Sequence, residues 1–190
     1  MGPLAGPVVA AAVVFAPGTR MSGLADSKTL QAGERERLAA LIARHALGVG
    51  VGIVQPAEID RGGVHQAGHR AMRRALAELG AEPLSFVLVD GRRIPRVGTP
   101  QAAYPKGDTF VASIAAASIV AKVHRDALMQ MLAGRYPVYG FDRHMGYGTA
   151  VHLAALRTYG PSPIHRRSFA PVAAVTPRQL AFSAMEREGH

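Results

Sequence analysis

A nine-residue apolar run near the start of the chain, from Pro7 to Phe15, most constrains how this sequence can fold. Between its ends it consists only of Val and Ala, and it is bounded by Gly6-Pro7 and Pro17-Gly18, which are typical of turns. It is too short to span a bilayer, which needs about 20 apolar residues. Strands that are nearly continuous in apolar residues are typical of sheets covered on both faces. The run therefore predicts a buried strand in a layered α/β domain.

The rest of the chain alternates between short apolar runs and helical stretches, which is the pattern of an α/β fold. Leu38, Leu41 and Ile42 share one face of a predicted helix. A short strand from Ser85 to Val89 is predicted to deliver Asp90 at its C-terminal end. The remaining predicted elements are a strand at 47–54 and helices at 64–79, 109–132 and, capped by Thr149, up to residue 159.

Composition narrows the class of protein. The chain has 190 residues, which predicts one domain, and it has no cysteine, which excludes disulfides and thiolate chemistry. Its N-terminus lacks the basic segment of a signal peptide, so we expect a cytoplasmic protein. We also expect it to be a monomer and to have no membrane contact. Lys and Arg number 22 against 13 Asp and Glu, a net charge of +9. This charge favours a polyanionic partner such as nucleic acid, although an Arg-rich composition alone explains it equally well.

Two carboxylates stand out by position. Asp90 follows a predicted buried strand, and Asp108 directly precedes the longest predicted helix. In open α/β sheets, sites form outside the carboxyl ends of strands, where paired carboxylates can hold a divalent metal ion. Taken singly, Asp before Gly is typical of a turn and Asp before a helix is typical of a cap. Both interpretations stay open on position alone.

Seven sequence blocks, in one order and spacing from residue 2 to residue 172, resemble the conserved blocks of type 2 ribonucleases H. No single block is decisive, but seven together are a specific signal. They are Gly2-Pro3-Leu4-Ala5-Gly6-Pro7-Val8-Val9, Asp26-Ser27-Lys28-Thr29-Leu30, Val89-Asp90-Gly91, Lys106-Gly107-Asp108, Ser113-Ile114-Ala115-Ala116-Ala117-Ser118-Ile119-Val120-Ala121-Lys122-Val123 with Arg125-Asp126, Tyr139-Gly140-Phe141 with His144 and Gly146-Tyr147, and His165-Arg166-Arg167-Ser168-Phe169 with Pro171-Val172.

The resemblance implies a fold and a reaction. The expected fold is ribonuclease H-like, a mixed five-stranded sheet flanked by helices, with a catalytic domain at 1–172 and a C-terminal tail at 173–190. The expected reaction is endonucleolytic hydrolysis of the phosphodiester 5′ to a ribonucleotide, in an RNA–DNA hybrid or embedded in duplex DNA. It uses two divalent ions, Mg²⁺ or Mn²⁺, held by four carboxylates. Such hard cations prefer carboxylate oxygens, and a pair of them can stabilise both the attacking and the leaving oxygen.

The resemblance also assigns roles to residues of this chain. Asp90 and Asp108 match the third and fourth metal-binding carboxylates. Tyr147 matches a tyrosine that packs on the sugar at the RNA–DNA junction and helps to recognise the 2′-OH, the group that distinguishes RNA from DNA. Gly2 matches the last residue of a Gly-Arg-Gly element whose backbone reads that junction. The candidate phosphate contacts, for each of which a solvated surface charge is the alternative, are Lys28, Lys106, Lys122, Arg125, Arg166 and Arg167.

One departure from the family pattern concerns the start of the chain. In the family, a strand ending in Asp-Glu-x-Gly-Arg-Gly precedes the Pro-Leu block, whereas here Met1 stands where Arg is usual. We therefore expect the first strand and its Asp-Glu pair to lie outside these 190 residues, which leaves the neighbouring strands without ladder partners. A start assigned too far downstream and a decayed paralogue both explain this. Two divalent ions carry +4, and Asp90 with Asp108 supplies only −2, so we expect little or no cleavage by residues 1–190 alone.

Three hypotheses follow from the sequence. In the first, the complete product is an enzyme that cleaves at ribonucleotides in DNA. In the second, the chain is a catalytically impaired module that binds RNA–DNA hybrids through its basic surface without cutting them. In the third, residues 1–190 are an unstable fragment without a function of their own.

Overall fold

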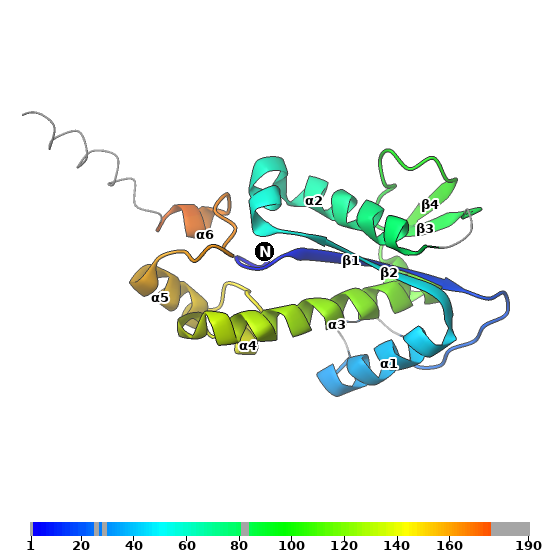
Figure 1. Ribbon diagram of the computed structural model, residues 1–190, viewed down its shortest axis with the longest axis horizontal. Helices are drawn as coiled ribbons and strands as arrows, with labels where there is room; N and C mark the ends of the chain where they lie inside the picture. Colours follow the sequence, from blue (N-terminus) through cyan, green and yellow to red (C-terminus); the bar gives the residue numbers. More distant parts are fainter. Residues whose placement is uncertain (1, 25–26, 28–29, 81–83, 176–190) are drawn as a thin grey trace, which may run out of the picture. The chain divides into compact units, whose positions relative to one another are not determined.

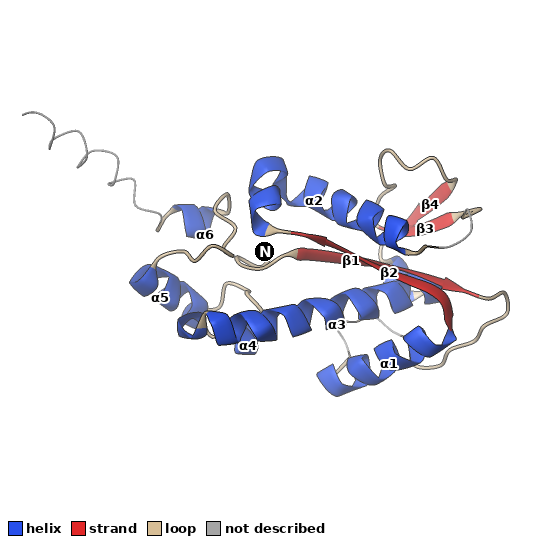
Figure 2. Cartoon of the chain, viewed as in Figure 1, coloured by secondary structure: helices blue, strands red, loops and turns tan. Residues whose placement is uncertain are grey.

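The computed structural model describes residues 2–24, 27, 30–80 and 84–175. Within these ranges the chain forms two compact units, one made of residues 1–6 and 129–190 and the other of residues 7–128. Helices and strands alternate along the chain, so the predicted α/β class is confirmed (Figure 2). That residues 1–172 act as one catalytic domain stays a prediction. Lys28 and most of the predicted tail lie outside the described residues.

The unit of residues 7–128 contains two strand pairs. Strand β1 (Val8–Phe15) pairs antiparallel with β2 (Ala46–Val54), and β3 (Val87–Asp90) pairs in parallel with β4 (Gln101–Tyr104). The expected mixture of strand directions is therefore present. The described residues form four strands in two separate pairs, one strand fewer than the family's sheet, whose first strand we expected to lie outside these residues. This part of the chain supplies no strand to join β1 to β3.

Six α-helices complete the described structure. Helix α2 begins at Pro56, eight residues before the predicted start at Val64, and Gly63, with φ of 78°, separates this added first segment from the predicted one. Two four-residue helices, α4 and α6, lie where no helix was predicted. The helices are α1 (Ala32–His45), α2 (Pro56–Glu78), α3 (Ala112–Arg135), α4 (Phe141–His144), α5 (Ala150–Tyr159) and α6 (Ala170–Ala173).

The β1–β2 pair lies between helices on both faces, as the apolar run from Pro7 to Phe15 predicted (Figure 1). Helix α2 packs on one face against the glycines of β2. A Cβ atom at Gly52 would lie only 1.9 Å from the carbonyl oxygen of Ala71, and one at Gly50 would lie 2.1 Å from that of Ala75. The other face of β2 turns Val49 and Val51 toward a core that is formed with α1 and α3. Glycine on one face therefore sets how closely α2 approaches.

The outer side of α2 carries an ion-pair network. Glu58 accepts hydrogen bonds from Arg74 at 2.8 Å and Arg70 at 3.1 Å, and it also accepts from the backbone N–H of Gln55 at 3.3 Å. These contacts, the Arg74 hydrogen bond first, lower the pKa of the Glu58 carboxyl to about 2. The charges of Arg70 and Arg74 are thus partly neutralised within the protein.

A groove with a volume of about 510 Å³ lies beside β1 in the same unit. It is lined by seven residues of β1, by β3, and by small and apolar side chains of α2 and α3, among them Met72, Leu76 and Ala117. All eight residues of β1 are only half-buried, although all eight are apolar. In the described ranges β1 pairs only with β2 and β3 only with β4, so each strand faces the groove with an open edge. That a preceding strand would pair with these two edges stays a prediction.

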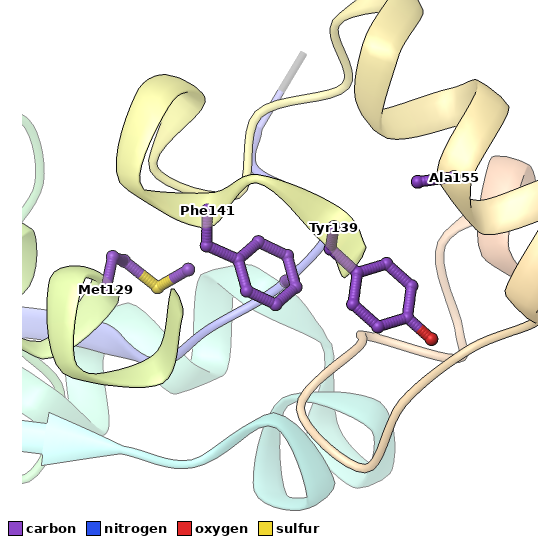
Figure 3. Packing of buried hydrophobic residues seen from close by; sticks show 5 residues of the cluster. Met129, Tyr139, Phe141 and Ala155 are labelled. Atoms are coloured by element: carbon purple, nitrogen blue, oxygen red, sulfur yellow. The ribbon is translucent and has the colours of Figure 1, made fainter. Parts of the chain in front are cut away.

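The unit of residues 1–6 and 129–190 has its own core. Ala5, Met129, Tyr139, Phe141 and Ala155 pack together, with the Tyr139 and Phe141 rings stacked at 5.3 Å (Figure 3). The backbone N–H of Gly6 donates to the carbonyl of Ile164 at 2.9 Å. The first residues of the chain are thereby fixed to a segment near its end. None of the helices among the described residues has the length and apolar character needed to cross a membrane.

Candidate active site

Asp90 and Asp108 come together at the ends of two neighbouring strands. Asp90 is the last residue of β3 and lies opposite Tyr104, the last residue of β4. One carboxylate oxygen of Asp90, Oδ1, accepts a hydrogen bond at 2.9 Å from the backbone N–H of Gly107, which is seventeen residues further along the chain and next to Asp108. Parallel neighbours bring their carboxyl ends to one edge, where α/β sheets form their sites. The side chain of Asp90 therefore joins two strand ends and does not merely form a local turn.

The turn that carries Asp108 is tightly built. Lys106 adopts a left-handed conformation with φ of 60°, and a single 3₁₀ turn follows from Gly107 to Thr109. A Cβ atom at Gly107 would lie 2.6 Å from Ile114 Cδ1, so glycine is needed for this close approach. Asp108 is only 6% exposed, whereas Lys106 is exposed. A carboxylate in this position is costly to bury without positive charge or hydrogen-bond donors.

The two carboxylates are the right type of ligand for a divalent metal ion, since Mg²⁺ and Mn²⁺ prefer hard oxygen ligands. They do not make up a full ligand set. Across the described part of the chain, no group of three or more His, Cys, Asp or Glu side chains is placed to hold a metal ion.

Lys122, another cationic candidate in this unit, is engaged within the protein. Its ammonium group donates to both carboxylate oxygens of Asp126, one helical turn further along α3. Arg35 approaches the same carboxylate at 3.5 Å. The Lys122 side chain keeps a quarter of its surface exposed, so a contact with phosphate stays a prediction. Lys28 lies outside the described residues.

Tyr147 lies in the unit of residues 1–6 and 129–190. The residue is 45% exposed, whereas its backbone is held by several hydrogen bonds. Its N–H donates to the carbonyl of His144 at 2.8 Å. Its own carbonyl accepts from Thr149 N–H at 2.9 Å and from His152 Nδ1 at 2.8 Å. These hydrogen bonds restrict the backbone of the residue that carries the exposed phenol.

The same unit brings the start of the chain next to the Tyr147 loop. Leu4 N–H donates to the carbonyl of Gly146 at 2.8 Å, and a Cβ atom at Gly146 would lie 2.6 Å from the carbonyl oxygen of Ala5. Gly146, with φ of 80°, therefore admits this backbone contact where another residue would be strained. The segment that begins at Gly2 and the loop that carries Tyr147, both predicted to contact the ribonucleotide, belong to one packed region.

Arg166, predicted to contact phosphate, is found in the interior of its unit. It is 1% exposed, its Nε donates to the carbonyl of Gly6 at 3.0 Å, and its guanidinium lies 5.3 Å from the centre of the Phe169 ring. It thus holds the start of the chain in place. The sequence indicated an exposed basic cluster here because the block of consecutive cations hides which of them points inward. We leave Arg166 out of the phosphate contacts proposed below.

Sequence-based reasoning gave no role to three histidines of this unit. His152 and His165 are 0% and 1% exposed, and His144 stacks on His152 with ring centres 4.6 Å apart. Burial first, and then the neighbouring His152, lowers the pKa of His165 to about 4. Burial likewise lowers the pKa of His152. Their spacing along the chain carries no periodic signal, because they come from three separate segments.

An α/β fold in which one carboxylate ends a strand and a second lies in a turn bonded to the first suits metal-dependent hydrolysis of phosphodiesters, since hard divalent ions prefer carboxylate oxygens. Comparison with known proteins defines the family. The family model for ribonuclease HII matches residues 1–172. The chain is 54% identical to ribonuclease HII of Dechloromonas aromatica (strain RCB) over 180 residues, which are 95% of this chain and 89% of that protein. The chain belongs to the ribonuclease HII family, whose members are divalent metal-dependent endoribonucleases acting on RNA–DNA hybrids.

Solved structures agree with this assignment. The crystal structure of ribonuclease H2 from Pyrococcus horikoshii OT3 superposes with a TM-score of 0.76 at 26% identity, covering 92% of each chain. Bst ribonuclease HIII, solved in complex with Mn²⁺, superposes with a TM-score of 0.66 at 20% identity, covering 92% of this chain and 65% of that one. The second likeness concerns the fold alone.

Proposed function

We propose that this protein hydrolyses the phosphodiester 5′ to a ribonucleotide, in RNA–DNA hybrids or within duplex DNA, and that Asp90 and Asp108 bind its divalent ions. The hydrogen bond from Gly107 N–H to Asp90 Oδ1 carries this assignment, because it ties the two strand ends that bear the carboxylates into one site.

Mg²⁺ or Mn²⁺ is the proposed ion, and when bound it supplies a Lewis acid for the phosphodiester and an activated water for attack. The residues of this chain would hold and orient it. Asp90, with Oδ1 engaged by a backbone N–H, has Oδ2 available to point toward an ion, and Gly107 keeps the turn narrow enough for Asp108 to follow closely.

We propose that several groups of this chain share the recognition of the ribonucleotide and its phosphates. The phenol of Tyr147 packs on the sugar, the backbone at Gly2 reads the junction, and Lys106 and Lys122 approach phosphate. The net charge of +9 supports a polyanionic substrate and steers its approach. We further propose that the protein acts as a cytoplasmic monomer.

A second function is favoured by one observation. The described residues hold no cluster of three potential metal ligands, so residues 1–190 alone suit the binding of a hybrid duplex better than its cleavage. In that case the chain would bind a hybrid with strong salt dependence and without turnover.

Metal binding by residues 1–190 can be tested without any activity. Adding Mn²⁺ in small steps is expected to broaden the backbone amide NMR signals of Asp90, Gly107 and Asp108 first, because paramagnetic relaxation falls steeply with distance. The Asp90→Asn variant should need more Mn²⁺ for the same broadening, while Asp142→Asn, which changes an exposed carboxylate in the other unit, should behave like the parent chain. Broadening that begins elsewhere and spares residues 107–108 would contradict the proposed site.

A further inference from the structure

Three imidazoles surround the loop that carries Tyr147, and two of them are fully buried. Phe141 contacts His152 edge-on at 5.4 Å between ring centres, and Tyr139 lies 4.8 Å from His165. Figure 3 shows Tyr139 and Phe141 side by side in this core. Polar rings in such an apolar core are costly unless each nitrogen has a hydrogen-bond partner. The pattern of partners therefore indicates what the rings do.

The partners fix the tautomer of each buried ring. The backbone N–H of Ser162 donates to His165 Nδ1 at 3.0 Å, so this nitrogen carries no proton. In the neutral ring the proton is then on Nε2, which lies 3.0 Å from His152 Nε2 and donates to it. His152 must therefore carry its proton on Nδ1, which lies 2.8 Å from the carbonyl oxygen of Tyr147. The hydrogen bonds run in one direction, from Ser162 through two imidazoles to Tyr147.

The third imidazole holds the same loop from the other side. His144 Nδ1 accepts from the N–H of Gly146 at 3.2 Å, which leaves the proton on Nε2, and Nε2 donates to the carbonyl of Tyr139 at 2.8 Å. Met145 and Gly146 adopt positive φ angles of 48° and 80°, and the helical ladder of α4 ends with the bond from Met145 N–H to the Phe141 carbonyl at 2.9 Å. The His144 ring adds side-chain hydrogen bonds where this ladder stops.

We propose that His152 is a positioning residue for Tyr147, and that the relay from Ser162 through His165 and His152 fixes the Tyr147 peptide so that its exposed phenol is presented to the ribose. This role rests on the proposed function of Tyr147. An apolar side chain of similar size at residue 152 would fill the core but would remove the hydrogen bond that His152 Nδ1 donates to the Tyr147 carbonyl. Burial lowers the pKa of both His152 and His165, which favours the neutral forms that the relay requires.

The relay itself can be tested on residues 1–190 in the absence of substrate. Long-range ¹H–¹⁵N correlation spectra at neutral pH report which ring nitrogen of each histidine carries the proton. We expect the proton on Nδ1 of His152 and on Nε2 of both His165 and His144. A proton on Nε2 of His152 would reverse the direction of the chain and overturn the relay, whatever the function of Tyr147.

The positioning role can be tested by a double-mutant cycle on binding. The readout is the ratio of affinities for a duplex with one ribonucleotide and for the same all-DNA duplex. His152→Phe is expected to lower this ratio about 5-fold, a loss typical of one hydrogen bond. His152→Asn, whose amide N–H can take the place of Nδ1–H, should restore much of it. In a Tyr147→Ala background neither substitution should change the ratio further.

The outcomes separate two failures. If His152→Phe lowers the ratio equally in the parent and in the Tyr147→Ala background, the histidine does not act through Tyr147 and the proposal is overturned. If Tyr147→Ala itself leaves the ratio unchanged while the tautomers are as stated, the relay stands but the proposed contact of Tyr147 with the ribose is wrong, and with it the positioning role. Thermal unfolding of each variant shows that the compared proteins are folded.

Discussion

Joining an apolar strand that ends in Asp-Glu ahead of Gly2 is expected to raise the cleavage rate of residues 1–190 by about 100-fold or more. The reason is charge, since the added pair completes a set of four carboxylates for two divalent ions, and such ions contribute several kcal/mol to hydrolysis of a phosphodiester. Cleavage of a duplex with one embedded ribonucleotide, followed over time in Mg²⁺ or Mn²⁺, measures the effect.

The structure supplies the place for such a strand. The groove of about 510 Å³ is lined by β1 on one side and β3 on the other, and each presents an open edge. A strand in this groove would satisfy the backbone groups of both edges and cover the half-buried apolar residues of β1. Slower hydrogen exchange of the β1 and β3 amides in the extended chain would report that the strand has docked.

A strand that ends in Asn-Gln in place of Asp-Glu is the matched control. It should fill the groove and slow exchange in β1 and β3 to the same extent, yet leave cleavage at the level of residues 1–190. Cleavage by residues 1–190 at a rate close to that of the Asp-Glu version would contradict the prediction, as would full activity of the Asn-Gln version.

The substitution Gly52→Ala is expected to lower the free energy of unfolding by about 3 kcal/mol, the upper part of the range for overpacked cores. The added methyl group would lie 1.9 Å from the Ala71 carbonyl oxygen and 2.6 Å from the Ala75 backbone nitrogen. Both atoms belong to the backbone of α2, so no side-chain rotation relieves the clash, and the helix must move away from β2.

Gly48→Ala provides the control in the same strand. A Cβ atom there would meet its nearest neighbour, the flexible Leu79 side chain, at 3.4 Å, which is ordinary contact. Urea unfolding of both variants should show a large loss of stability for Gly52→Ala and little change for Gly48→Ala. Equal urea midpoints of unfolding for the two variants would mean that Gly52 does not limit how closely α2 approaches β2.

Much of the fold and part of the site could be predicted from local sequence. The apolar run at 7–15 forms a strand between helices, as its continuity in Val and Ala indicated. Thr149 caps α5, its side chain accepting from the N–H of His152 at 3.3 Å. Asp90 ends a strand, as expected. These features depend on short-range preferences and on periodic burial, both of which are visible in a few consecutive residues.

Other features depend on how distant segments meet. Strand β4 has four residues and no clear alternation, so its partner β3, and not its own sequence, makes it a strand. The bond between Gly107 and Asp90 joins two elements, and the burial of Arg166 follows from the path of residues 2–6. The histidine relay likewise needs the tertiary approach of His165 to His152. None of these contacts leaves a spacing signal in the sequence.

Asp108 is the carboxylate whose role most directly decides whether this site binds the metal ion. In the chain extended by the Asp-Glu strand, Asp108→Asn is expected to abolish divalent metal-dependent cutting 5′ to a single ribonucleotide, while Asp142→Asn, a change at an exposed carboxylate, keeps it. Both variants should bind the uncut duplex. Cleavage by Asp108→Asn at a rate close to that of Asp142→Asn would contradict the assignment of this carboxylate to the metal ion.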